Sequence, residues 1–145
     1  MVKPITLERI QYIAFALAKD TLEWDEPIPP FESRFPNILE SCAATPFQRF
    51  NKKSLYSGLI GKGAILFYLL IKNHPFQNGN KRIAVTSLLV FLYINNKWLK
   101  VDSKELYNFS VWIAQSPPKL KQEVTKAIEK FVKTYLVDFK PTQNI

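Results

Sequence analysis

The chain has 145 residues, of which 47% are hydrophobic and 22% are charged. This composition fits one compact domain over residues 1–145 and excludes a disordered chain, because the apolar content is too high. The longest apolar stretches are shorter than the roughly 18–20 residues that a membrane-spanning helix needs. The net charge of +8 favours an anionic partner, such as nucleic acid or a phosphate-bearing ligand.

The first part of the chain predicts two helices separated by a loop. Residues 7–19 follow a capping Thr6 and have apolar side chains at spacings of three and four, which is typical of an amphipathic helix. Residues 20–35 lose that period and contain three prolines, which predicts a loop with room for a short extended piece. A short helix is expected to begin near Pro36 and to end before Pro46.

The second part of the chain predicts four more helices. The stretch 80–95 is apolar on nearly every side, as expected of a buried helix at the centre of the fold. The predicted elements are helices at 54–72, 80–95, 103–116 and 119–137, a short extended segment at 98–101, and a tail at 138–145. About six helices and hardly any strand predict an all-α fold.

The only cysteine, Cys42, cannot form an internal disulfide, and the sequence does not open with a secretion signal. Both features predict a cytoplasmic protein. A lone cysteine with no local motif is expected to be a core residue rather than a nucleophile.

The positive charge is concentrated in the middle of the chain. Residues 49–100 hold nine basic side chains and no acidic one, whereas residues 1–48 hold four basic and seven acidic ones. The single histidine, His74, lies in the basic stretch. We therefore expect a site around His74 to work in a positive field that suits a nucleoside triphosphate.

The segment between the two most apolar helices carries the chemistry. It reads His-Pro-Phe-Gln-Asn-Gly-Asn-Lys-Arg over residues 74–82. A polar loop that turns into a buried helix places free N–H groups and the positive end of the helix dipole at the turn, which attracts anions. Lys81 and Arg82 strengthen this preference, and a neutral His74 imidazole can take a proton from an attacking hydroxyl.

These nine residues resemble the signature loop of the Fic/Doc family, H-x-F-x-[DE]-[AG]-N-[KG]-R, at eight of the nine positions. The helical frame over residues 1–137 is similar to that family's all-α fold. Lys81, and the absence of an arginine at Val85, resemble the Doc branch of death-on-curing toxins. Pro75 and Gly79 are more similar to the Fic branch, which transfers AMP.

The resemblance implies a role for each residue of the loop. His74 would be the catalytic general base, and Phe76 would anchor the loop in the core. The residues implied in nucleotide and phosphate binding are Gly79, Asn80, Lys81 and Arg82, with Arg82 as a cationic clamp. In Doc-type proteins a lysine at the place of Lys81 occupies the room that Fic enzymes use for the α-phosphate, so ATP binds reversed and gives up its γ-phosphoryl group.

The implied function is that of a kinase-like phosphotransferase, the toxin of a toxin–antitoxin system. Its target would be a hydroxyl of translation elongation factor Tu, and a small Phd-like antitoxin would neutralise it. No membrane contact is expected. Direct contact with nucleic acid is not expected either, because the sequence has no helix-turn-helix or RNA-stacking signature.

Asn78 departs from the family pattern, which has Asp or Glu at this place to hold Mg²⁺. Asparagine offers only a neutral oxygen, a weaker ligand for a hard cation. Three alternatives follow: the phosphates hold the metal, another segment supplies ligands, or catalysis is weak or lost. An AMP transferase, and an inactive nucleotide- or partner-binding module, are therefore kept as alternative functions.

Residues 20–35 lie where family members have a flap that docks the target segment. Their acidic side chains, Glu23, Asp25, Glu26 and Glu32, would suit a basic edge of the target. An ordinary loop is the alternative interpretation.

Overall fold

The computed structural model describes residues 1–21 and 27–139. These residues form six helices, counting α1, η1 and α2 as one continuous helix, and two small two-stranded sheets, which confirms the all-α fold class. The helices are α1 (Leu7–Arg9), η1 (Ile10–Ala14), α2 (Phe15–Thr21), α3 (Ile38–Ala44), α4 (Gly58–Lys72), α5 (Asn80–Tyr93), α6 (Ser103–Gln115) and α7 (Lys121–Tyr135). Short 3₁₀ turns lie at Phe31–Ser33, Thr45–Phe47 and Pro118–Leu120.

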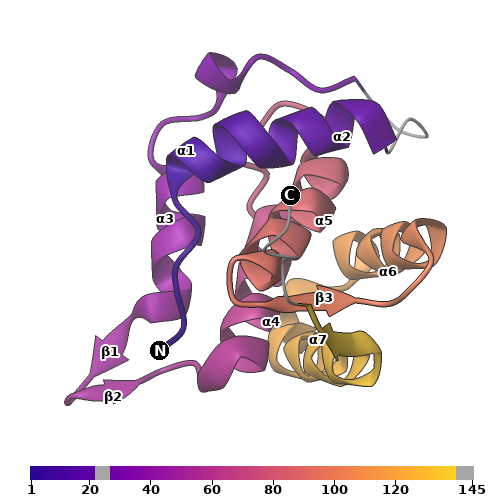
Figure 1. Cartoon of the computed structure of the whole chain (residues 1–145). Helices are drawn as coiled ribbons and strands as arrows, with labels where there is room; N and C mark the ends of the chain where they lie inside the picture. The colour runs from indigo at the N-terminus through magenta and orange to yellow at the C-terminus, as the bar shows by residue number, and fades with distance from the viewer. Residues whose placement is uncertain (22–26, 140–145) are drawn as a thin grey trace, which may run out of the picture.

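Two helices form the centre of the molecule. Helix α5 is buried along most of its length, as predicted, and α4 is equally buried, with eleven consecutive buried residues from Gly61 to Ile71. A Cβ atom on Gly63 would lie 3.4 Å from Leu88 Cδ1, an ordinary van der Waals contact, so α4 and α5 pack directly on each other at this position. The first helix lies across one side of this pair, and α6 and α7 cover another side (Figure 1).

The first helix follows its predicted bounds closely but is not a regular α-helix. Thr6 caps it, accepting a hydrogen bond from Arg9 N at 3.2 Å. The segment Ile10–Ala14 is π-helical, a distortion that an apolar period of three and four residues does not reveal. The helix continues to Thr21, so Asp20 is helical rather than part of the expected loop.

The structure corrects two predicted boundaries. Helix α4 begins at Gly58 and not at residue 54, because Lys53–Ser54 (β2) pairs with Arg49–Phe50 (β1) in a hairpin. Helix α7 ends at Tyr135, and the next residues, Leu136–Asp138 (β4), pair antiparallel with Lys97–Leu99 (β3). Asp138 is therefore a strand residue and not the start of a tail, while residues 140–145 lie outside the described part.

Cys42 is fully buried in α3, which confirms its predicted place in the core. Among the described residues, no helix is both long and apolar enough to cross a membrane.

Candidate active site

The loop between α4 and α5 is anchored in the core by Phe76. This side chain is 1% exposed and packs edge-on against Phe15 of α2, with 5.1 Å between ring centroids. The Phe31 ring lies at 6.3 Å from it. The predicted anchoring role of Phe76 matches this placement, and the three rings join the loop to the first helix and to the segment after it.

Asn80, the first residue of α5, closes the loop with its side chain. Its Oδ1 accepts a hydrogen bond from Phe76 N at 3.0 Å, and its Nδ2 donates to Phe76 O at 2.8 Å. Asn80 is 7% exposed, so both hydrogen bonds are shielded from water. The amide group thus holds the loop in shape by bonding to Phe76, and the N-cap position of α5 belongs to Gly79.

His74 stands at the open end of this loop. Its side chain is exposed, and its backbone has a φ of +48°, a left-handed conformation that is uncommon outside glycine. Its Nδ1 lies 3.5 Å from Asn80 Nδ2, an amide nitrogen that can only donate, and the distance is too long to fix the tautomer. Proton acceptance from a hydroxyl at Nε2 requires the tautomer with the proton on Nδ1, in which Nδ1 does not accept from Asn80.

The start of α5 offers backbone donors next to His74. The first intrahelical bond of α5 runs from Ile83 N to Gly79 O at 3.0 Å, so the preceding amides of the first turn have no partner within the helix. Gly79 caps this end with a φ of +72°, and a Cβ atom there would meet Ile28 Cδ1 at 3.2 Å. The conformation and the close neighbour both favour glycine at this position.

The two cations of the loop lie differently. Lys81 is half-buried on the first turn of α5. Arg82 is 5% exposed, and its Nη2 donates a hydrogen bond to the carbonyl oxygen of Ala18. Ala18 lies in the last turns of α2, where carbonyl groups carry negative partial charge. In this conformation Arg82 ties α2 to α5, so a phosphate-clamping role needs its remaining N–H groups or a different rotamer.

Asn78 does not fit a protein-borne Mg²⁺ site. Its Oδ1 is buried and has no hydrogen-bond partner in the described residues, so one neutral oxygen is available. No group of three or more Asp, Glu, His or Cys side chains that could hold a metal occurs in the described residues. Mg²⁺ is usually held by one or two carboxylates together with phosphate oxygens. We therefore assign no step of the chemistry to a metal.

The nine cations of residues 49–100 do not all gather around His74. Lys62 is buried and donates to Tyr56 O at 2.6 Å. Lys72 donates to Ala114 O at 3.3 Å and to Ser116 O at 2.5 Å, at the end of α6. Lys97 pairs with Asp138 between β3 and β4. Of the nine, Lys81 and Arg82 are the ones placed at the start of α5.

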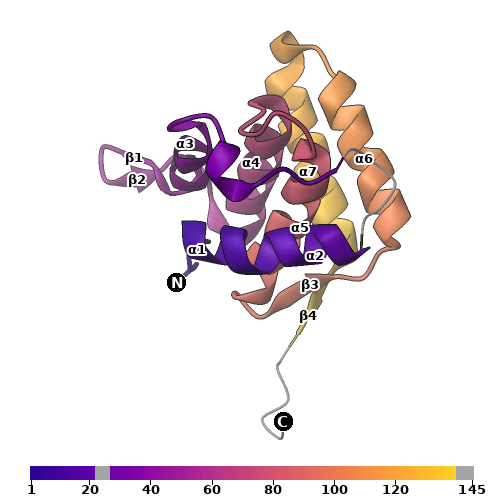
Figure 2. The ribbon, with the colours of Figure 1, turned by 90° about the horizontal axis from the view of Figure 1, so that it is seen from above.

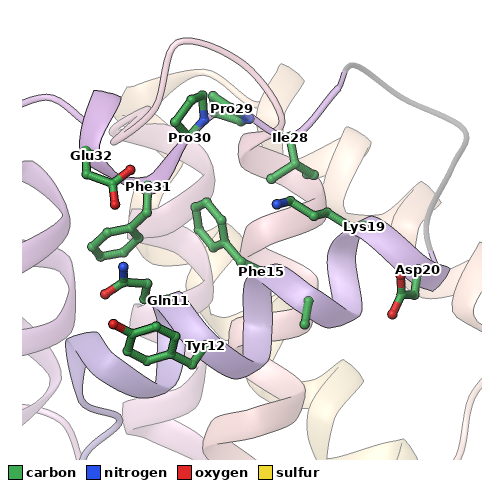
Figure 3. A pocket seen from close by; sticks show the side chains of 11 residues that line it. Gln11, Tyr12, Phe15, Lys19, Asp20, Ile28, Pro29, Pro30, Phe31 and Glu32 are labelled. Atoms are coloured by element: carbon green, nitrogen blue, oxygen red, sulfur yellow. The ribbon is translucent and has the colours of Figure 1, made fainter.

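The segment after the first helix covers one side of the loop. Pro27, Ile28 and Pro29 lie against Gly79. On its other side, a cavity of about 650 Å³ opens between this segment and the first helix, with Phe15 and Phe31 in its wall (Figure 3). Glu32 also lines this cavity. The expected flap of residues 20–35 lies partly outside the described residues, as do three of its acidic side chains, Glu23, Asp25 and Glu26.

Several residues that shape the site were not found by sequence reasoning. Phe35 N donates to Pro75 O at 2.9 Å and so fixes the loop from the segment before α3. In the first helix, Phe15 packs against Phe76 and Ala18 O accepts the hydrogen bond from Arg82. The Phe31 ring lies near Phe76 from a 3₁₀ turn. Each is far from the loop in sequence, so no local pattern could have identified it.

The comparisons with known proteins agree with this geometry. The family model described as Fic/DOC family matches residues 4–92, which include the first helix, the loop and all of α5 except its last residue. No curated protein and no solved structure shows a significant match to the chain. The matched stretch covers more than half of the sequence and contains every residue of the candidate site. The chain therefore belongs to the Fic/DOC family.

Proposed function

We propose that this protein is a Doc-like phosphotransferase that moves the γ-phosphoryl group of ATP to a hydroxyl of elongation factor Tu. Members of the Fic/DOC family are transferases that modify proteins. The observation that carries the proposal is the placement of an exposed His74 beside the first turn of α5, with Lys81 on that turn.

The residues of the site account for each part of this reaction. His74 accepts the proton of the target hydroxyl. The oxygen then bonds to the γ-phosphorus while the bond between the γ-phosphorus and the bridging oxygen breaks, and ADP leaves. The first amides of α5 and Lys81 offset the negative charge of the phosphates. Because the loop is held by Phe76 and Asn80, the imidazole and these donors keep a fixed relative geometry.

The experiment uses purified protein, elongation factor Tu and ATP labelled on either the α- or the γ-phosphorus. We expect label transfer from γ-labelled ATP only, loss of transfer in His74→Ala, and little change in Gln77→Ala, an exposed neighbour in the same loop. Transfer from α-labelled ATP would contradict the proposal and support AMP transfer, the second candidate, which Pro75 and Gly79 favour.

A third outcome is possible because of Asn78. Binding of ATP without transfer from either label would indicate an inactive nucleotide- or partner-binding module. Asn78→Asp provides a direct check, since a carboxylate is a better Mg²⁺ ligand than an amide. We expect this variant to raise the transfer rate at low Mg²⁺; equal or lower rates at every Mg²⁺ concentration would contradict the hypothesis that residue 78 limits Mg²⁺ binding.

The proposal includes a cytoplasmic site of action and a Phd-like antitoxin, whose disordered tail would fold against the protein. We expect expression of the wild type, and not of His74→Ala, to arrest growth. Co-expression of an antitoxin encoded beside the toxin should relieve the arrest. Growth arrest by His74→Ala at equal protein levels would show that toxicity does not depend on the proposed transfer.

A further inference from the structure

A two-stranded hairpin projects from the body of the protein before α4 (Figures 1 and 2). It pairs Arg49 with Ser54 and Phe50 with Lys53. Asn51 and Lys52 form the two-residue turn, with φ values of +51° and +66°. Positive φ at both positions is the hallmark of a tight turn whose twist matches that of the two strands, so the hairpin is a defined element and not an irregular loop.

The hairpin contributes nothing to the core. Every residue from Gln48 to Leu55 is exposed. Phe50 is 67% exposed and makes no ring-to-ring or cation–π contact with the described residues. Phe50 and Lys53 are directly opposite in the pairing, so both side chains lie on the same face of the hairpin. An exposed aromatic side chain and an exposed lysine side chain therefore share one face of the hairpin.

The hairpin also holds the largest group of cations in the basic stretch that the rest of the fold does not use. Lys52 and Lys53 are exposed, and within the described ranges 1–21 and 27–139 no hydrogen bond or ion pair engages their ammonium groups. Arg49 donates to Lys52 O at 2.6 Å and stabilises the turn. No carboxylate occurs within residues 49–100 to neutralise them. By contrast, Lys62 and Lys72 satisfy backbone carbonyls.

We infer that this hairpin is a binding surface for single-stranded nucleic acid. A single strand carries phosphates that can pair with Lys52 and Lys53, and it also carries unpaired bases that can stack on the ring of Phe50. An acidic protein surface would satisfy the cations but would leave the exposed ring without a partner unless it also offered an apolar pocket. The sequence shows no stacking signature because only one aromatic residue, Phe50, is involved, and its exposure next to the two lysines follows from the hairpin and not from a local pattern.

This surface is separate from the candidate active site. The hairpin precedes α4 and His74 follows it, and a helix of fifteen residues is about 22 Å long. The inference therefore does not depend on the proposed transfer reaction, and His74→Ala should bind nucleic acid as the wild type does.

The test measures fluorescence anisotropy of labelled dT₁₂ and U₁₂ with the full chain between 50 and 200 mM salt, an interval in which phosphate contacts weaken measurably. We expect a dissociation constant on the order of 1–100 μM. A plot of the logarithm of the binding constant against the logarithm of the salt concentration should have a slope of about −1.4 or steeper, since each phosphate contact to a single strand contributes about −0.7. In Lys52→Gln/Lys53→Gln this slope should become shallower by about 1.4. Phe50→Leu should weaken binding about tenfold without changing the salt slope, and Phe50→Tyr, which keeps an aromatic ring, should bind as tightly as the wild type.

Lys104→Gln/Lys119→Gln is the matched control, because it removes two exposed charges, one at the start of α6 and one in the 3₁₀ turn that follows α6, and it should change affinity less than twofold. Equal losses in this control and in the hairpin variant would overturn the inference, since net charge alone would then explain binding. Absence of binding by the wild type would also overturn it. Equally tight binding of polyglutamate, with no effect of Phe50→Leu, would assign the surface to an acidic protein instead.

Discussion

At the scale of single residues, the site depends on two side chains with different tasks. His74 is exposed and free to meet a target, while Asn80 is buried and holds the backbone that carries His74. A buried backbone N–H or C=O that loses its partner costs about 1–3 kcal/mol. The geometry of the loop is therefore expected to be most sensitive at Asn80 and the chemistry at His74.

Replacing Asn80 with alanine should lower the free energy of unfolding by about 2 kcal/mol, because Phe76 N and Phe76 O both lose their partner. Urea denaturation measures this change. Gln77→Ala, also in the loop but exposed, should stay within about 0.5 kcal/mol of the wild type. An Asn80→Ala variant as stable as Gln77→Ala would show that these hydrogen bonds do not hold the loop.

Cys42 gives a pH-dependent prediction. Burial raises the pKa of its thiol from 9.0 to about 11. Below pH 9 the thiol is protonated in both the folded and the unfolded chain; above it, the unfolded chain ionises first, so the folded state loses stability as pH rises towards 11. The loss due to Cys42 should approach about 1.4 kcal/mol per pH unit.

Denaturation of the wild type and of Cys42→Ala between pH 8 and 10.5 measures the loss of stability due to Cys42 ionisation. It appears as the difference between the two profiles of unfolding free energy against pH. The substitution also opens a small cavity, which lowers stability equally at all pH values and so cancels in the slope. Parallel profiles above pH 9 would mean that the thiol ionises equally easily in the folded protein.

At the scale of elements, a cation of the basic stretch links two helices. Lys72 is the last residue of α4, and its ammonium group donates to Ala114 O and Ser116 O at the end of α6. Carbonyl groups at a helix C-terminus have no partner within the helix and carry negative partial charge. A basic side chain there stabilises the helix, so part of the positive charge in the sequence is structural.

Lys72→Met should keep the packing of the side chain and remove both hydrogen bonds, lowering the free energy of unfolding by about 1–2 kcal/mol. Lys100→Met removes the same charge from an exposed position and serves as the control, with an expected change below about 0.5 kcal/mol. Thermal or urea denaturation compares the two. Equal effects would assign the stability change to net charge and not to the end of α6.

At the scale of the whole molecule, stability is unevenly distributed. Helices α4 and α5 bury most of their residues and pack on each other, whereas the hairpin at Arg49–Ser54 buries none. Backbone amides in a buried core exchange with solvent only through large openings, and those of exposed elements exchange through local ones.

Hydrogen exchange should therefore be slowest in the central turns of α4 and α5 and fast in the hairpin. Substitutions at Phe50 should leave the protection of α4 unchanged, because its side chain is 67% exposed and is not part of the hydrophobic core. Strong protection of the hairpin amides in the free protein would contradict this distribution.

The sequence by itself determined the features that depend on local pattern. Apolar periods located the main helices, because a buried helix face repeats every three or four residues. The loop at residues 74–82 was recognisable because its chemistry is concentrated in nine consecutive positions. The family match over residues 4–92 confirms that the motif lies in the expected family.

Only the tertiary structure decided how distant residues are used. The pairing of Lys97–Leu99 with Leu136–Asp138 joins segments about forty residues apart, and Arg82 reaches Ala18 across 64 positions, so neither contact leaves a local pattern. The same holds for charge: composition counts cations, but the fold places them on backbone carbonyls, on a carboxylate, beside the loop, on the exposed hairpin or elsewhere on the surface. The positive stretch that first suggested a single phosphate site thus serves several distinct physical tasks.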